Sequence, residues 1–224
     1  MDISQEKNIK FLKNGKISRS IIDWGIKNYR DFPWRYTFNP FNVAISEMLL
    51  RRTKASHVTD AYMKITEIYS NMCDLGRADI KYISRIISSL GINGRIYLIL
   101  KTASYICENY GGNIPEDRNI LDRIPGFGDY TVSAIRVFGF QKDDPLIDVN
   151  TVRILARMSG IKLNDSLRRS ELIHKIYSCV LGDADPVKFG YAILDMGAII
   201  CRSTPACSEC PVSEFCSYFT SLKK

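Results

Sequence analysis

The sequence predicts an all-α protein of about ten short helices. Apolar residues recur at the three- and four-residue spacing of an amphipathic helix along most of the chain, and no stretch shows the strict alternation of a half-buried strand. Prolines, glycines and capping residues interrupt these stretches at short intervals, as they do at helix ends. With 46% hydrophobic residues, the chain can bury a sizeable core.

The first thirty residues predict a basic helix. Its apolar stripe at helical spacing consists of Ile17, Ile21, Ile22, Trp24 and Ile26. The lysines of this segment are either a solvated face or contacts for phosphate, and the sequence leaves both open. Over the whole chain, 31 Lys and Arg exceed 24 Asp and Glu, a net charge of +7, which favours a polyanionic partner such as nucleic acid.

A second helix is expected to begin at the Asn39 cap. Glu47 lies among inward-facing apolar residues of this helix, so it is either solvated at the helix edge or placed in a pocket. The helix pattern alone favours the solvated edge. Arg51 and Arg52 follow at the end of this helix.

The middle of the chain predicts further helices, with Asn93 and Gly94 in a glycine turn between two of them. The expected helices lie near 57–70, 78–89, 95–109 and 117–123.

A glycine turn follows in Ile124-Pro-Gly-Phe-Gly-Asp-Tyr130. Pro125 cannot continue a preceding helix, and Gly126 and Gly128 permit backbone angles that other residues resist. The chain then opens a new helix, whose free N–H groups form an anion site. The segment is either a plain helix–helix turn or a hairpin that holds a backbone phosphate.

Asp148 stands at the start of another predicted helix. The hairpin helix is expected over 129–139 and a loop over 141–145, followed by helices near 149–159, 166–181 and 186–200. A carboxylate at a helix N-terminus is stabilised by the helix dipole, so Asp148 is at least a helix cap.

The seven cysteines fall into two groups. Cys73, Cys107 and Cys179 are isolated in apolar helical surroundings, where we expect small core residues. The remaining four lie within sixteen residues, at Cys201, Cys207, Cys210 and Cys216. No apolar stretch suggests a membrane helix and the polar start of the chain predicts no signal peptide. We therefore expect an intracellular (cytoplasmic or nucleoid) setting of prokaryotic type, where clustered thiols favour a metal over disulfides.

The hairpin, the aspartate in Ile147-Asp-Val-Asn-Thr-Val-Arg153 and the four-cysteine cluster occur together and in order. In this combination the chain resembles the helix-hairpin-helix DNA glycosylases of the endonuclease III and MutY superfamily, from about residue 17 to 218. The resemblance implies a six-helix domain over 40–139. It also implies a second domain, formed by 1–39 and 140–224, that carries a 4Fe–4S cluster, with DNA in the cleft between the two.

The resemblance assigns the cluster to Cys201, Cys207, Cys210 and Cys216. The last two gaps match the family pattern, whereas the first gap is five residues where the family usually has six. Four thiolates bind either an iron–sulfur cluster or zinc, and the family favours iron–sulfur with a structural role.

The same resemblance assigns the chemistry. Asp148 matches the aspartate that stabilises the sugar cation or activates water, and Tyr130 stands where bifunctional members carry a Schiff-base lysine. A monofunctional glycosylase is therefore expected. Gly126 and Gly128 become the phosphate anchor, and Asn93 matches a loop that relatives insert into the minor groove.

Arg51 and Arg52 align with the stretch that contacts the widowed base in relatives, where an arginine can read guanine or contact a phosphate. Glu47 then becomes a pocket residue. The Leu49-Leu-Arg-Arg-Thr53 stretch most resembles the archaeal Mig-type glycosylases, which act on T·G and U·G mispairs. The sequence stops soon after Cys216, so we expect no additional C-terminal domain for 8-oxoguanine recognition.

Two alternatives remain at this point. One is a MutY-like adenine glycosylase that acts on A·8-oxoguanine or A·G. The other is a non-catalytic DNA-binding module, against which Asp148 argues, because a protein that only binds DNA has no need of such a carboxylate. The expected partner is double-stranded DNA with a mispair, bound by a monomer, with abasic-site repair enzymes acting downstream and no membrane involved.

Overall fold

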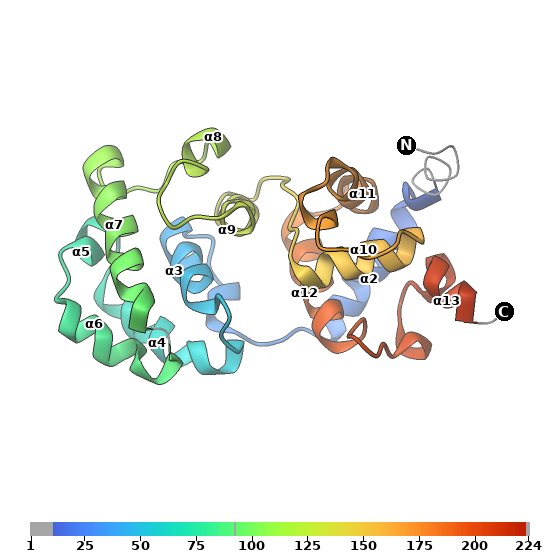
Figure 1. Cartoon of the computed structure of the whole chain (residues 1–224), viewed down its shortest axis with the longest axis horizontal. Coiled ribbons are helices and arrows are strands. Elements are labelled where there is room, and N and C mark those ends of the chain that lie inside the picture. The colour runs from blue at the N-terminus through green and yellow to red at the C-terminus, as the bar shows by residue number, and fades with distance from the viewer. Residues whose placement is uncertain (1–10, 92, 223–224) are drawn as a thin grey trace. The chain divides into compact units, whose positions relative to one another are not determined.

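The computed structural model describes residues 11–91 and 93–222, with the side chain of Asn93 outside the description (Figure 1). Its described part contains helices and no strand, so the all-α prediction is confirmed. The α-helices are α2 (Gly15–Lys27), α3 (Pro40–Leu50), α4 (Ala55–Ile68), α5 (Met72–Gly76), α6 (Ile80–Ile87), α7 (Ile96–Tyr110), α8 (Arg118–Leu121), α9 (Asp129–Ala134), α10 (Val149–Ser159), α11 (Glu171–Leu181), α12 (Pro186–Ile199) and α13 (Ser217–Leu222). A π-helical turn, Ile135–Gly139, continues α9 directly.

Side-chain caps set where several helices begin. Asn39 accepts a hydrogen bond from the Phe41 backbone N–H and is followed by Pro40, and Asp185 accepts from the backbone N–H groups two and three residues on. These residues satisfy backbone donors that a helix start leaves without an intrahelical partner. The caps are local in sequence, which is why the pattern predicted them.

The chain divides into two compact units. Unit 2 comprises residues 31–144, and unit 1 combines residues 1–30 with 145–224. The sequence-based domain limits, 40–139 against 1–39 with 140–224, remain a prediction about the functional domains. None of the described helices has the length and apolar character that a membrane span would need.

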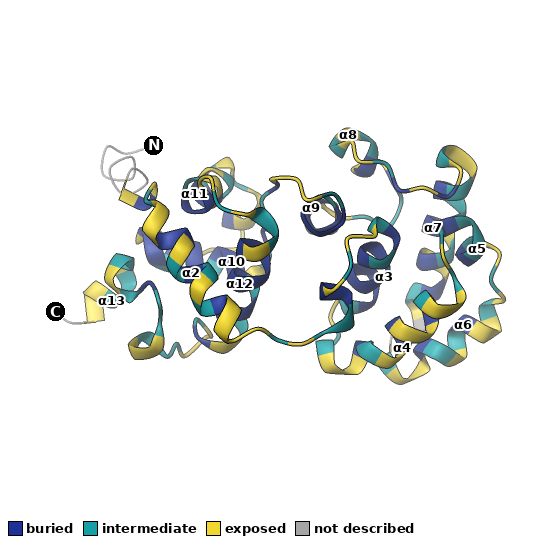
Figure 2. Cartoon of the chain, turned by 180° about the vertical axis from the view of Figure 1, so that it is seen from behind, coloured by how far each residue is buried: buried dark blue, intermediate teal, exposed yellow. Residues whose placement is uncertain are grey.

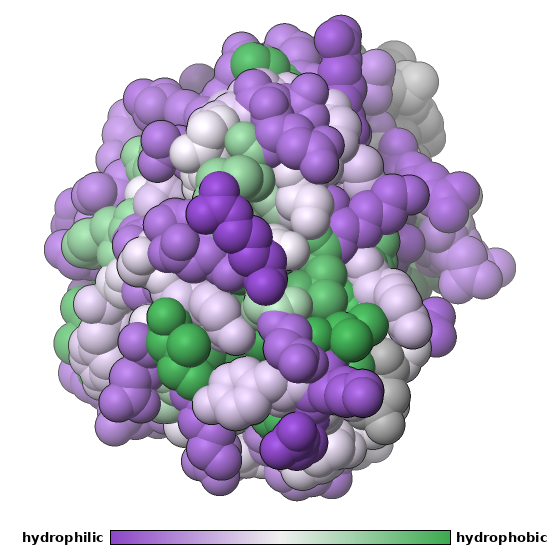
Figure 3. Space-filling model, turned by 90° about the vertical axis from the view of Figure 1, so that its left-hand side faces the viewer, coloured by the Kyte–Doolittle hydropathy of each residue, from purple (hydrophilic) through white to green (hydrophobic). Residues whose placement is uncertain are grey.

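In unit 2, α3 is central and packs against α4, α9 and the π-helical turn. Most of α3 is buried (Figure 2). A Cβ on Gly139 would lie 3.0 Å from the Pro40 Cα, so the end of the hairpin helix closely approaches the start of α3. The outer face near α5, α6 and α7 is mainly hydrophilic with scattered apolar patches (Figure 3), which is normal for a solvent-facing surface.

In unit 1, α12 packs against α2 and α10. A Cβ on Gly25 would lie 2.4 Å from the Ala192 Cβ, so α2 and α12 need a glycine at their closest approach. The apolar stripe predicted for α2 is only partly buried. Ile17 and Ile21 are fully buried, whereas Ile26 is 67% exposed because it lies off the face that meets α12.

The prediction that Cys73 and Cys107 are isolated core residues is wrong. They form a disulfide with a Cα–Cα distance of 4.7 Å across a sequence separation of 34 residues. The bond arises because α5 packs on α7, a contact that no local pattern encodes. Cys179 is a free, half-buried thiol.

Candidate active site

The hairpin turn in unit 2 requires glycine at position 126. Gly126 has φ +91, and a Cβ there would lie 2.4 Å from the Thr102 hydroxyl oxygen. That hydroxyl oxygen lies 2.6 Å from the Pro125 carbonyl oxygen, so α7 holds the hairpin through a buried side chain. The turn is therefore fixed by tertiary contacts as well as by its own residues.

Gly128 does not use the conformational freedom of glycine, because its φ is −105, which any residue adopts. A Cβ there would have nothing within 4 Å. Gly128 instead leaves open space beside the start of α9, where backbone N–H groups lack intrahelical partners.

Arg51 is tied to the hairpin, because its Nη1 donates to the Gly126 carbonyl oxygen at 3.2 Å. Arg52 is exposed and has φ +56, a left-handed backbone that is uncommon outside glycine. Burial lowers the pKa of Arg95, and the positive charges of Arg51 and Arg52 lower it further. Within the described residues, no carboxylate forms an ion pair with any of these three arginines. They form a positive cluster beside the hairpin.

Glu47 and Tyr130 both belong to unit 2. Glu47 is 8% exposed, so it is buried and not solvated at the helix edge as the helix pattern alone suggested. Its helix, α3, packs against α9, which carries the half-buried Tyr130. The backbone of Asn93 lies in a short 3₁₀ turn, Asn93–Arg95, and the predicted role of its side chain falls outside the described part.

Asp148 caps α10 in unit 1, as its position predicted. Its Oδ1 accepts from the Thr151 backbone N–H at 2.7 Å, and its Oδ2 accepts from Asn150 Nδ2 at 3.1 Å. The side chain is half-buried. Two donors and the N-terminus of a helix all favour a charged carboxylate with a fixed orientation.

A chain of hydrogen bonds continues from Asp148 to the cysteine loop. Arg153 Nη2 donates to Asn150 Oδ1 at 2.8 Å, and Arg153 Nε donates to the Cys201 carbonyl oxygen at 2.7 Å. A Cβ on Gly197 would lie 2.7 Å from the Asn150 Cβ, so a glycine on α12 makes room for this chain. Asn150 and Arg153 were not identified as functional residues from the sequence, although their spacing of three puts these two side chains on one helix face.

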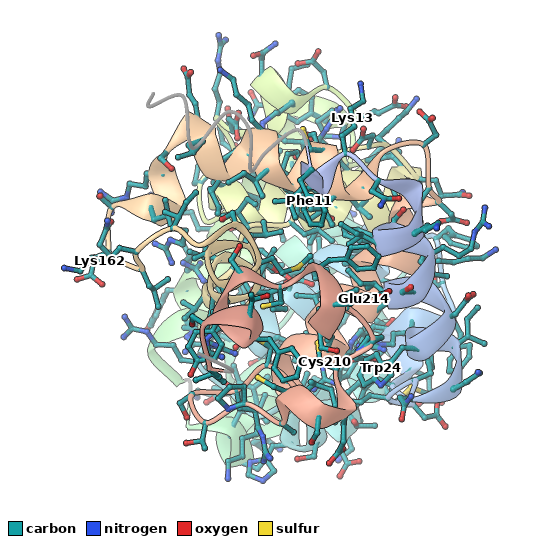
Figure 4. The ribbon with its side chains drawn as sticks, turned by 90° about the vertical axis from the view of Figure 1, so that its right-hand side faces the viewer. Phe11, Lys13, Trp24, Lys162, Cys210 and Glu214 are labelled. Carbon is teal, nitrogen blue, oxygen red and sulfur yellow. A yellow bond between two sulfur atoms is a disulfide. The ribbon has the colours of Figure 1, made fainter. Side chains whose placement is uncertain are left out.

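The four clustered cysteines line one small cavity in unit 1, together with Arg157 and Tyr218. Figure 4 shows this end of the molecule with Cys210 labelled. Arg157 Nη1 lies 3.3 Å from the Cys201 sulfur and donates to the Arg202 carbonyl oxygen at 2.6 Å. Its guanidinium also lies over the Tyr218 ring, 5.0 Å from the centroid. One arginine thus fixes the loop from several sides.

The thiols of this cavity are of a type that binds metals, but they do not lie close to one another in the structure. Burial raises the pKa of Cys210 to about 11 and raises the pKa of Cys207 and Cys216. Among the described residues, no group of three or more Cys, His, Asp or Glu side chains is close enough to hold a metal ion. The donor chemistry fits a thiolate-bound metal group, since all four cysteines line one cavity together with Arg157.

No protein-family model matches the chain. The chain is 33% identical to the thymine-DNA glycosylase of Aeropyrum pernix over 93% of this chain and 98% of that protein. It is 31% identical to the thymine/uracil-DNA glycosylase of Methanothermobacter thermautotrophicus, over 89% of this chain and 91% of that protein. The adenine DNA glycosylase of Buchnera aphidicola is 29% identical over 92% of this chain, which spans 59% of that longer protein.

Solved structures agree with these relatives. A thermostable thymine-DNA glycosylase superposes with a TM-score of 0.86 at 29% identity, over 96% of this chain and 98% of that one. Endonuclease III in a trapped covalent complex with DNA superposes with a TM-score of 0.77 at 18% identity, which identifies a shared fold.

Proposed function

Because the chain belongs to the thymine/uracil-DNA glycosylase family, we propose that it is a monofunctional DNA glycosylase that excises thymine or uracil from T·G and U·G mispairs. The observation that carries this proposal is Asp148, a half-buried carboxylate held by two donors at the start of α10. A protein that only bound DNA would have no need of an oriented carboxylate beside a polyanion, where its charge is unfavourable.

The reaction breaks the bond between the base and the deoxyribose, and positive charge builds up on the sugar. Asp148 stabilises that charge or activates the attacking water. The target nucleotide must first leave the base stack, which costs least at a mispair. Tyr130 carries a hydroxyl and no amine, so it cannot form a Schiff base. Water is then the nucleophile and an abasic site is the product.

The unit 2 surface supports DNA binding. Gly128 leaves the backbone at the start of α9 accessible, which suits a phosphate oxygen. Arg51 and Arg52 add positive charge that no described carboxylate neutralises. An arginine from this cluster can donate two hydrogen bonds to the O6 and N7 of guanine. A guanine opposite the flipped base is therefore the expected partner.

We further propose that Cys201, Cys207, Cys210 and Cys216 hold a 4Fe–4S cluster, with zinc as the alternative. The shared cavity of the four thiols supports this. Such a group would act structurally, by holding the loop that Arg153 and Arg157 bind through its carbonyl oxygens. Iron, sulfide and zinc analysis of the purified protein distinguishes the two, and a colourless protein with stoichiometric zinc would contradict the iron–sulfur assignment.

A panel of end-labelled duplexes tests the function. The duplexes carry T·G, U·G, A·8-oxoguanine, A·G or thymine glycol, and strand breakage is measured before and after alkali. We expect breakage of the T·G and U·G strands after alkali alone. Breakage without alkali, or an adduct trapped by borohydride, would indicate a lyase. Binding without base release would indicate a DNA-binding module.

Adenine excision is the second candidate. The similarity to adenine DNA glycosylases and the burial of Glu47, a residue type that can donate a proton to a leaving base, favour it over other chemistries. Release of adenine opposite 8-oxoguanine, with intact T·G strands, would establish this reading in the same panel.

A further inference from the structure

We propose that Arg118 is a positioning residue for DNA binding, which pairs with Asp129 and so keeps that carboxylate from repelling the DNA backbone at the hairpin. The inference deepens the proposed function and rests on it, because it concerns the hairpin surface to which DNA would bind. Every residue that it involves belongs to unit 2.

Asp129 lies where a negative charge matters for a polyanionic ligand. It directly follows Gly128, at which a Cβ would have nothing within 4 Å, and its own side chain is 58% exposed. On the same turn, Arg51 donates to the Gly126 carbonyl oxygen. A positive and a negative side chain therefore both lie at the turn, and the negative one would repel a phosphate unless a cation neutralised it.

Arg118 uses a different nitrogen atom for each of its carboxylate partners. Nη2 donates to Asp129 Oδ1, Nη1 donates to Asp144 Oδ1, and Nε lies 3.6 Å from Asp122 Oδ2. The donors of a guanidinium form a rigid planar fork, so the bond to one carboxylate fixes the direction of the next. In the described part of the chain, no other cation pairs with Asp129.

Asp144 holds the Arg118 guanidinium in this position. Asp144 is 4% exposed and also accepts from the Ser133 hydroxyl and from Arg136 Nε, each at 2.6 Å. A buried carboxylate is costly unless it is paired and hydrogen-bonded, so the network favours one placement of its donors. Burial acts to lower the pKa of Arg118, but Asp144 and Asp129 raise it above its ordinary value, and the guanidinium stays charged.

The pair connects the two helices on either side of the glycine turn (Figure 1). Arg118 is the first residue of α8, and Asp129 is the first residue of α9. An acidic residue at a helix start also stabilises the helix through its dipole, and this effect needs no partner. The two roles of Asp129 differ in what they change, because helix stabilisation acts on the melting temperature, whereas neutralisation by Arg118 acts on DNA affinity.

The test compares Arg118→Gln with the double variant Arg118→Gln/Asp129→Asn. The first leaves the Asp129 carboxylate unpaired, and the second removes its charge as well. A fully matched duplex is the probe, because contacts to phosphate do not depend on sequence and no base is released from it during the measurement. Fluorescence anisotropy measures the affinity at low and high salt, at a temperature where each variant is folded, and the melting temperature is measured in parallel.

We expect Arg118→Gln to weaken binding by about 3- to 10-fold at low salt, and by less at high salt, where the added repulsion is screened. Adding Asp129→Asn should restore the affinity to within about twofold of wild type, while the melting temperature stays low because Asp144 still lacks its partner. Asp129→Asn alone should change the affinity much less than it does in the Arg118→Gln background. An unchanged affinity of Arg118→Gln, or a loss that Asp129→Asn does not reverse, would overturn the proposal.

Two controls separate charge pairing from other effects. Arg85→Gln removes the same positive charge from an exposed position on α6, which carries no residue of this network, and should leave the affinity unchanged. Ser133→Ala removes a donor to Asp144 and leaves Arg118 in place, so it should lower the melting temperature with little change in affinity. If Ser133→Ala weakened binding as much as Arg118→Gln, loosening of the network would explain the loss and the proposal would be wrong.

The double variant Arg118→Gln/Asp144→Asn keeps the proposal testable if Arg118→Gln does not fold. It removes the buried charge that needs Arg118 and leaves Asp129 unpaired, so adding Asp129→Asn should again raise the affinity. No gain in affinity would refute the proposal. The wild-type protein separates the two inferences, because a wild type that binds no duplex refutes DNA binding, and with it the proposed function.

Discussion

The hairpin of unit 2 and the Asp148 segment of unit 1 use arginine side chains in opposite ways. In the hairpin, Arg51 bonds one carbonyl oxygen and the cluster it belongs to keeps its positive charge unneutralised among the described residues. In unit 1, Arg153 is fully engaged in fixing Asn150 and the Cys201 carbonyl. In the first arrangement the positive charge stays available for a ligand. In the second, the arginine instead holds the residues that fix the Asp148 carboxylate. On the proposed function, the first arrangement would serve DNA binding and the second base removal.

The largest expected effect concerns base removal, the role proposed for the Asp148 segment. Asp148→Asn keeps the size of the side chain but removes its charge, so base release should fall by on the order of 1,000-fold. DNA affinity should stay within a few-fold, because the hairpin is untouched. Single-turnover assays and equilibrium binding measure both quantities. Asp165→Asn, an exposed aspartate of the same unit, is the control and should behave as wild type; a near-normal rate for Asp148→Asn would contradict the assigned role.

The two hairpin glycines test the DNA-binding role proposed for unit 2. Gly126→Ala should destabilise the free protein by about 1 to 3 kcal/mol, because the new methyl group meets the Thr102 hydroxyl and the backbone has φ +91. Gly128→Ala should leave the melting temperature unchanged, since its Cβ has open space. Both should weaken DNA binding. Equal melting temperatures for the two variants would show that the hairpin is not fixed as described.

Smaller effects are expected from the arginines. Replacing Arg51 and Arg52 by alanine should reduce the preference for T·G over T·A by about tenfold, because a lost bidentate guanine contact costs about 1 to 3 kcal/mol. Arg85→Ala, in an exposed position on α6, is the matched control. Competition between the two duplexes measures the preference. If both duplexes weaken equally, the arginines contact phosphate and do not read the base.

The smallest expected effect is confined to unit 2. Burial raises the pKa of Tyr62 from 10.0 to about 12. The unfolded chain therefore loses this proton first, and stability that is complete below about pH 10 decreases as the pH rises towards 12. Denaturant unfolding between about pH 9 and 12, a range that spans the ordinary tyrosine pKa of about 10, measures this loss. For Tyr62→Phe the free energy of unfolding should decrease less over that range. Tyr97→Phe, at a side chain 73% exposed, should leave the dependence unchanged.

Features that depend on neighbouring residues could be predicted from the sequence. The Asn39 and Asp148 caps act over two or three residues, and the Gly126 turn is encoded within its own loop. Glu47 could not be decided in this way, because a helix pattern shows only that it borders the apolar face. Its burial depends on which elements cover α3.

Features formed by distant residues were missed for a physical reason. Arg118 meets Asp144 across 26 positions and Arg153 meets Cys201 across 48. Nothing in the local pattern of any of these residues specifies its partner, because packing of whole helices brings them together. Gly128 has a backbone angle that any residue adopts, so what its missing side chain changes is the open space beside it.

The Cys73–Cys107 bond makes a covalent ring of the chain between these positions, with α6 and the Asn93 turn inside it. A single cut by a protease in that ring opens a loop but releases no fragment while the bond is intact. The nicked protein should therefore run as one chain on a denaturing gel and separate into two pieces only after reduction. The disulfide thus keeps the two products of such a cut together in the part of unit 2 that holds this turn.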